Sequence, residues 1–158
     1  MTDVTSASPL LGLWRRCQGF PGGKYFFSRM LAKKVPYTGS IHARVDELTP
    51  GYARVRMADR GSLRNHLFSI HAIALTNLGE LTSGLAMTAA MPADLRGIPV
   101  ELNIEFVKKA RGEITAEGRS PVPDPDRDAH YEAEAVMKDT EGDRVAVLRA
   151  RWTVSRRP

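Results

Sequence analysis

The sequence has 158 residues, of which 42% are hydrophobic and 26% are charged, and its net charge is +5. This length and composition are typical of one globular domain with a hydrophobic core, and they exclude wholesale disorder. The single cysteine, Cys17, excludes an intramolecular disulfide and argues against a thiolate zinc site. The N-terminus lacks a basic start followed by an apolar run, so we expect no secretory signal and a cytoplasmic protein.

The positive charge is concentrated at the N-terminus. Residues 1–34 contain six basic residues and one acidic residue, whereas the remaining chain contains 17 of each. The main part of the chain is therefore neutral overall. It also contains no zinc-finger spacing and no basic-aromatic RNA-binding motif, so we expect no nucleic-acid partner.

Residues 8–34 predict two short amphipathic helices. Ser8 is a suitable N-cap, Pro9 fits the first helical position, and the glycines of residues 19–23 interrupt the run. The second helix would place its apolar residues on or near one face and its basic residues elsewhere. Such helices could lie on a membrane surface, but the interpretation favours helices that pack on the domain. We expect residues 1–35 to form a helical extension.

The rest of the chain predicts two strands, one long helix and then four strands. Alternation of apolar and polar residues predicts a hairpin over 40–58, and the helix is expected at about 69–90. The later alternating segments are 100–106, 113–120, 131–137 and 146–154. Short turns between successive strands indicate an antiparallel sheet whose apolar face needs a cover. The apolar helix is the natural cover, so an α+β domain is expected over 36–155.

Glu80 is an ionisable residue in the middle of this apolar helix. Because each helical residue advances by about 100°, Glu80 shares a narrow stripe with small and polar residues. These are Thr76, Asn77, Ser83 and Gly84. An ionised carboxylate is costly in an apolar interior, so this stripe must meet a partner, a cleft or water. Glu80 could form an ordinary buried ion pair with an arginine, or it could be a functional acid with a shifted pKa.

His71 precedes Glu80 by nine residues, a rotation of about 900° that places the two on opposite sides of one helix. If both residues belong to one site, the second must come from another subunit, which predicts a dimer or a tetramer. Asn65 and His71 fall just before or within the first turn of the helix. Free backbone N–H groups and the positive end of the helix dipole favour an anion or an oxyanion there. No histidine pair has metal-ligand spacing, so no metal site is expected.

The pattern Asn65-x5-His71-Ala72-x7-Glu80, followed by the strand PVELNIEFVKKARG, resembles the hotdog-fold acyl-CoA thioesterases of the phenylacetate-pathway type. The segments VPYTGSI, RNHLFSIHAIAL and FVKKARG are similar to a bacterial branch of the same superfamily. The resemblance implies a hotdog fold, in which an antiparallel sheet wraps around one long central helix, over residues 36–155. The N-terminal helical extension is a feature of this branch.

The resemblance further implies hydrolysis of a thioester of coenzyme A or of an acyl carrier, with coenzyme A as part of the substrate and no separate cofactor. Glu80 would activate water or attack the carbonyl, and the Ala72 N–H would hold the oxyanion. Asn65 would orient the water or the carboxylate, and His71 would hydrogen-bond near the carbonyl. By the rotation argument, Glu80 would face Asn65 and His71 of the neighbouring subunit. Six further residues are expected to contact substrate: Asn77, Ser83 and Gly84 on the helix, and Lys108, Lys109 and Arg111, which could bind phosphates or simply be solvated.

Two departures from the family pattern keep other functions open. Ala72 replaces a glycine at the proposed oxyanion position, and Pro99 stands where a serine or threonine is common. These residues favour a second hypothesis, a hotdog domain that binds acyl-CoA or another hydrophobic ligand without turnover. A third hypothesis is a 3-hydroxyacyl dehydratase, but the Gly-His-Phe-Pro signature and longer gap of those enzymes are absent.

Overall fold

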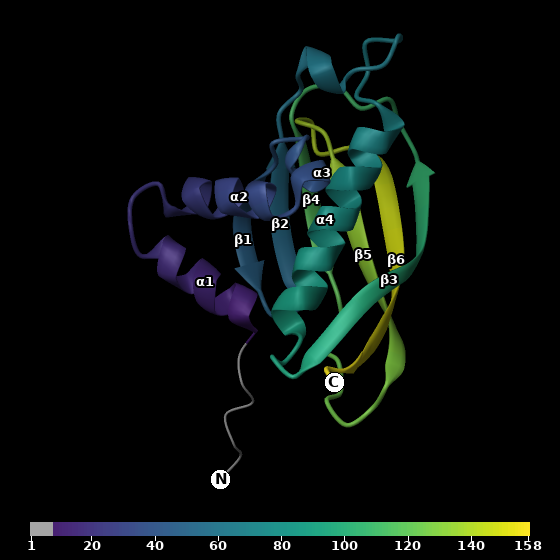
Figure 1. Cartoon of the computed structure of the whole chain (residues 1–158). Helices are drawn as coiled ribbons and strands as arrows, with labels where there is room; N and C mark the ends of the chain where they lie inside the picture. The colour runs from purple at the N-terminus through teal and green to yellow at the C-terminus, as the bar shows by residue number, and fades with distance from the viewer. Residues whose placement is uncertain (1–7) are drawn as a thin grey trace.

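The computed structural model describes residues 8–158, which form one antiparallel sheet with a long helix across one face (Figure 1). The helices are α1 (Pro9–Gln18), α2 (Gly23–Lys34), α3 (Pro36–Gly39) and α4 (Ala72–Ala90), with a 3₁₀ turn at Gly61–Leu63. The strands are β1 (Arg44–Thr49), β2 (Tyr52–Met57), β3 (Leu95–Phe106), β4 (Ile114–Arg119), β5 (Ala129–Lys138) and β6 (Arg144–Arg156).

The sheet order is β1-β2-β4-β5-β6-β3, and every neighbouring pair is antiparallel. After β2, the chain crosses the sheet as α4 and returns as β3 at the far edge. The order of two strands, a helix and four strands confirms the prediction. A sheet wrapped around one central helix also confirms the hotdog fold.

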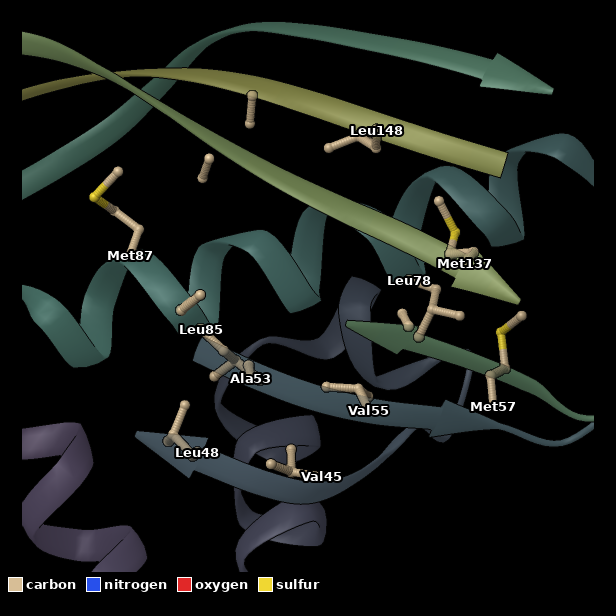
Figure 2. Packing of buried hydrophobic residues seen from close by; sticks show 14 of the residues in the cluster. Val45, Leu48, Ala53, Val55, Met57, Leu78, Leu85, Met87, Met137 and Leu148 are labelled. Carbon is tan, nitrogen blue, oxygen red and sulfur yellow. The ribbon is translucent and has the colours of Figure 1, made fainter. Parts of the chain in front are cut away.

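The core lies between α4 and the sheet. Leu78 and Met87 of α4 lie with Val55 of β2, Met137 of β5 and Leu148 of β6 in one apolar cluster (Figure 2). All five side chains are fully buried, and such burial of apolar surface is the main favourable term in folding.

Two glycines allow α4 to lie unusually close to the sheet. A Cβ on Gly118 of β4 would lie 2.4 Å from the carbonyl oxygen of Thr82. A Cβ on Gly79 of α4 would lie 2.9 Å from the Cβ of Leu148. The helix is therefore in direct contact with the strands at these points, and its position along the sheet is closely constrained.

The predicted hairpin and central helix exist, but the first strand and the helix begin at later residues than expected. β1 begins at Arg44, and a register shift between Val45 and Glu47 places Val45 and Leu48, rather than alternate residues, in the core. Such bulges add one residue to a strand and break the period of two. The helix α4 begins at Ala72 rather than at about 69, and the short helix α3 was not predicted.

β3 departs most clearly from expectation. Its apolar residues were expected to lie under the helix, but α4 covers the other strands more fully, and β3 is one of the two edge strands, with β1 at the other edge. A register shift between Pro99 and Glu101 interrupts its alternation. Leu102 and Phe106 lie opposite the buried residues Ala150 and Ala146, yet they are 44% and 49% exposed. β3 therefore presents an uncovered apolar face beside an unpaired strand edge.

The N-terminal helices pack on the domain, as the interpretation favoured. They lie at the left of Figure 1, where α1 contacts α4 and β1 and α2 contacts β1, and Trp14 of α1 contacts Phe27 of α2 edge to face, with ring centroids 5.0 Å apart. Ser8 does not cap α1 with its side chain; its Oγ instead donates to the carbonyl oxygen of Thr88 at 2.8 Å. The division at residue 35 stays a prediction. Among residues 8–158, no helix is long and apolar enough to cross a membrane.

Candidate active site

Glu80 lies in the wall of a cleft of about 590 Å³ between α4 and the N-terminal helices. We call this the Glu80 cleft. Its other walls include Leu13 of α1, Leu31 of α2, Leu95 of β3 and Trp152 of β6. The stripe that contains Glu80 on α4 thus meets a cleft, one of the three surroundings that the sequence allowed.

The carboxylate of Glu80 is half-buried and has no hydrogen-bond or ion-pair partner among residues 8–158. Among residues 8–158, no arginine forms the buried ion pair with Glu80 that the sequence had left open. Burial raises the pKa of Glu80 above that of an exposed glutamate, because desolvation penalises the charged form. A carboxylate with a raised pKa is a better proton acceptor when it is ionised.

The neighbours of Glu80 on the predicted stripe divide into two groups. Gly84 lines the cleft, and a Cβ there would lie 3.8 Å from Oε1 of Glu80. Asn77 is buried away from the cleft and donates from Nδ2 to the carbonyl oxygen of Tyr37 at 3.3 Å, which ties α4 to α3. Ser83 is fully buried, and its Oγ donates to the backbone carbonyl of Glu80 at 3.2 Å. In this chain, Asn77 and Ser83 have structural contacts, whereas Gly84 borders the cleft.

Asn65 organises the turn that precedes α4. Its Oδ1 accepts hydrogen bonds from the backbone N–H groups of Leu67 at 2.9 Å and Ser69 at 3.2 Å. Within this turn, Phe68 has a φ of 55°, a left-handed conformation that is unfavourable for a bulky residue. The Nδ2 group of Asn65 has no acceptor in residues 8–158, so it is available as a donor.

His71 is the N-cap of α4. Its Nδ1 accepts a hydrogen bond from the backbone N–H of Ile73 at 3.0 Å. An imidazole that accepts at Nδ1 carries its proton on Nε2, which leaves Nε2–H as the outward donor. The ring is exposed, so this donor faces the surroundings of the molecule.

A second cleft, of about 330 Å³, lies at the start of α4, and we call it the Ala72 cleft. Ala72, Asn65, Phe106 and Lys109 line it. The N–H of Ala72 is the first of the helix and has no acceptor within residues 8–158. A free N–H at the positive end of a helix dipole suits an anion or an oxyanion. Glu80 and Ala72 therefore lie on one helix but line different clefts.

Of the three basic residues predicted to bind phosphates, Lys108 is committed elsewhere. Its Nζ lies 2.7 Å from a carboxylate oxygen of Asp139 and 2.7 Å from one of Asp143. These carboxylates raise the pKa of Lys108 well above its usual range. Among residues 8–158, Arg111 makes only a long contact of 3.5 Å with the carbonyl oxygen of Leu67 and is not part of the cleft lining, whereas Lys108 and Lys109 both line the Ala72 cleft. Lys109 lines this cleft and has no carboxylate partner among residues 8–158, so it is the best placed of the three for an anionic ligand.

Two further residues escaped the sequence reasoning. Among the described residues, the buried polar side-chain atoms without a hydrogen-bond partner are Oγ of Ser69 and Nε1 of Trp152. Ser69 lines the Ala72 cleft and Trp152 lines the Glu80 cleft. Unpaired buried polar atoms are uncommon in proteins, and a catalytic or binding role is one explanation for them. The alternation over 146–154 predicts the burial of Trp152, but no sequence pattern shows that its N–H or the hydroxyl of Ser69 lacks a partner, because hydrogen-bond partners depend on tertiary packing.

The family model described as a domain of unknown function, DUF4442, matches residues 23–154. The chain belongs to this family. The match begins at α2, within the N-terminal extension, and it includes Asn65, His71, Ala72 and Glu80. No curated protein matches the chain.

Solved structures resemble the DUF4442 chain over most of its length. The genomics protein APC5556 is 28% identical with a TM-score of 0.80, over 94% of this chain and 99% of its own. A protein of unknown function from Pseudomonas aeruginosa, named a probable thioesterase, is 28% identical with a TM-score of 0.72, over 87% and 97% of the two chains. A thioesterase family protein from Silicibacter pomeroyi, 19% identical with a TM-score of 0.71 over 82% and 96% of the two chains, shares the fold.

Proposed function

We propose that this protein is a thioesterase that hydrolyses an acyl thioester of coenzyme A, or of an acyl carrier, at a site shared between two subunits. The observation that carries the proposal is the half-buried carboxylate of Glu80, which lines an apolar cleft and has no partner among residues 8–158. The names of two similar structures, a probable thioesterase and a thioesterase family protein, support the same class of reaction.

In the proposed reaction, Glu80 takes a proton from water while the water oxygen attacks the thioester carbonyl carbon. The carbonyl oxygen becomes an oxyanion, which accepts hydrogen bonds from the Ala72 N–H and from Nε2–H of His71. Each such donor contributes about 3–4 kcal/mol in other acyl-transfer enzymes. The carbon–sulfur bond then breaks, and the thiolate takes up a proton to leave as free thiol. Asn65 Nδ2 is the available donor to orient the water. A direct attack by the Glu80 carboxylate, followed by hydrolysis of the anhydride, gives the same products.

The positions of the two clefts support a site shared between two subunits. Ala72 and Glu80 are eight residues apart, which is about 12 Å along the helix axis and about 800° of rotation. One thioester group cannot contact both within one chain. A second copy with its Ala72 cleft against the Glu80 cleft would complete the site. Such a copy would bind at the exposed apolar face and free edge of β3, because exposed apolar patches beside open strand edges promote pairing.

A second candidate function is binding of an acyl thioester without turnover. The observation that favours it is Ala72, whose methyl group stands beside the free N–H where similar enzymes have glycine. A methyl group there narrows the approach of the carbonyl oxygen to its donor.

The test is release of free thiol by the purified full-length protein from a panel of acyl-CoAs, with the Glu80→Gln variant in parallel. We expect the wild type to hydrolyse at least one member and the variant to lose most of the rate, because glutamine cannot accept the proton. Equal rates in the two proteins would exclude Glu80 as the base or nucleophile. Binding of acyl-CoA without thiol release would favour the second candidate.

A further inference from the structure

Part of the lining of the Glu80 cleft comes from the N-terminal helices, which lie outside the sheet and its central helix. Five partly buried apolar side chains line it from three helices: Leu10 and Leu13 of α1, Met30 and Leu31 of α2, and Leu81 of α4. Below them lie the buried side chains of Phe27, Leu95 and Trp152. Apolar side chains that pack on the core but stay partly exposed to a cleft are typical of a binding site for an apolar group.

The charged residues that line this cleft differ in their exposure to solvent. Among its lining residues, Lys34, Arg96 and Arg157 are exposed, whereas Glu80 is half-buried. The side chain of Arg157 is also directed to the carbonyl oxygen of Leu95, at 2.9 Å. The apolar part of the cleft therefore offers no buried cation to balance a charged group, and an ionised group on the ligand would be costly there.

The volume sets the size of the occupant. A cleft of about 590 Å³ falls within the usual range for small-molecule sites. At about 30 Å³ for each water-sized group, it holds at most roughly 20 such groups. This volume is far larger than an acetyl group requires and is sufficient for an uncharged acyl chain of medium length.

We infer that the Glu80 cleft is the acyl-chain site of this protein and that α1 and α2, through Leu13 and Leu31, set which chain lengths it accepts. This inference rests on the proposed function, since it places the thioester carbonyl at Glu80 and the acyl chain beneath the N-terminal helices. The ligand class is an uncharged, medium-chain aliphatic or aryl acyl thioester. Short acyl chains are disfavoured because they would contact too little of the cleft wall. Charged acyl groups are disfavoured because the cleft has no buried cation to offset the cost of burying their charge.

Calorimetric binding to the full-length Glu80→Gln protein tests the inference without turnover. The probes are coenzyme A and its acetyl, hexanoyl, decanoyl and palmitoyl thioesters. We expect affinity to rise by up to about fourfold for each methylene group buried. Decanoyl-CoA should bind at least about tenfold more tightly than acetyl-CoA.

Two substitutions of Leu31, made in the Glu80→Gln protein, change the cleft in opposite directions. Leu31→Trp should narrow it and remove most of the preference for decanoyl-CoA, and Leu31→Ala should widen it and move the preference toward palmitoyl-CoA. Phe26→Trp is the matched control, because Phe26 lies on the same helix, is 54% exposed and is not part of the cleft lining. It should leave all affinities unchanged. Leu31→Ala keeps the inference testable if the larger tryptophan prevents folding.

The outcomes separate this inference from the proposed function. Affinity that is independent of chain length, or a preference that both Leu31 variants retain, would overturn the acyl-chain site. Thiol release that depends on Glu80 but not on chain length would also overturn the acyl-chain site, and it would still support the thioesterase function. Chain-length-dependent binding without thiol release from any probe by the wild type would overturn the thioesterase and leave the acyl-chain site standing.

Discussion

Nδ1 of His71 accepts a hydrogen bond of 3.0 Å from the backbone N–H of Ile73, so one imidazole both caps α4 and presents Nε2–H outward. These two roles can be separated by substitution. His71→Asn should keep the cap, since asparagine is among the best N-cap residues, but its shorter side chain cannot place a donor where Nε2–H of the imidazole lies. His71→Ala removes both and should lower the free energy of unfolding by about 1 kcal/mol. Thiol release should fall in both variants, whereas chemical denaturation should show a loss only in His71→Ala. Equal stability of the two variants would contradict the capping role.

Glu80 should reduce stability at neutral pH. Because burial raises its pKa in the folded state, folding favours the protonated acid. Stability from this group is fully present below the pKa of an exposed glutamate, about 4.3, and is lost as pH rises through the higher folded-state pKa. Glu80→Gln should therefore raise the melting temperature at pH 7 to 8 relative to wild type, by an amount that shrinks toward pH 4. Melting curves across this range provide the test, and a difference independent of pH would argue against the raised pKa.

The same shift predicts the pH profile of the enzyme. If ionised Glu80 is the base, kcat/KM should fall on the acid side with an apparent pKa above that of an exposed glutamate. Thiol release at fixed ionic strength measures this profile. A profile with its acid limb at the ordinary glutamate value, or with no acid limb, would assign the base elsewhere.

Mixing two inactive variants tests the shared site. Glu80→Gln and His71→Asn each damage a different half, so a mixed dimer contains one site with both defects and one intact site. With equal mixing and free exchange, half of the dimers are mixed, and about a quarter of wild-type activity should return. Activity of the mixture equal to the mean of the two variants would place both residues in one subunit's site.

Lys108 and Lys109 are neighbours with different expected roles. Lys109→Ala should raise KM for acyl-CoA by about two- to fivefold, as expected for an exposed ion pair of up to ~1 kcal/mol. High salt should reduce this difference. Lys108→Ala is the comparison, because Lys108 also lines the Ala72 cleft but its ammonium group is paired with Asp139 and Asp143. Its effect on KM should be smaller than that of Lys109→Ala, and a larger effect from Lys108 than from Lys109 would reverse the assignment.

Gly118 should be required for the contact between α4 and β4. Gly118→Ala brings a methyl group to within 2.4 Å of the Thr82 carbonyl oxygen, so it should cost about 1–3 kcal/mol of stability. Gly12→Ala is a suitable control, because Gly12 lies within the helix α1 and has no atom within 4 Å of an added Cβ. That change should be neutral or stabilising. Chemical denaturation of both variants measures these changes. A loss of stability in Gly118→Ala no larger than that in Gly12→Ala would contradict the close contact.

The fold could be predicted because its signals are local. Alternation over residues 40–58 and the apolar run ending at Pro92 each reflect one face or one element. The errors lie where local and long-range effects compete. The bulge near Asp46 breaks the alternation of β1, and Asn65 Oδ1 holds residues 65–69 in a turn although the sequence there continues the apolar pattern of the helix.

The candidate site could be predicted only in part. Helical periodicity placed Glu80 and His71 on opposite sides of one helix. It did not reveal that Gly84 borders the cleft while Ser83 is buried, because that depends on small rotations against the sheet. The sequence allowed a cleft beside Glu80 but did not indicate which residues line it. Its lining forms only when residues of α1 and α2 come near those of α4 in the folded chain.

The two sides of the Glu80 cleft are anchored in different ways. The α4 side is clamped to the strands at Gly79 and Gly118, where even a methyl group has no room. Among the described residues, the opposite side rests on side-chain packing of α1 and α2 and on three side-chain hydrogen bonds, which join Ser8 to Thr88, Lys24 to Asp46 and Ser28 to Val45. An engineer who wishes to reshape the cleft therefore has a modular route: redesign residues 9–34 and leave the half that carries Glu80 untouched.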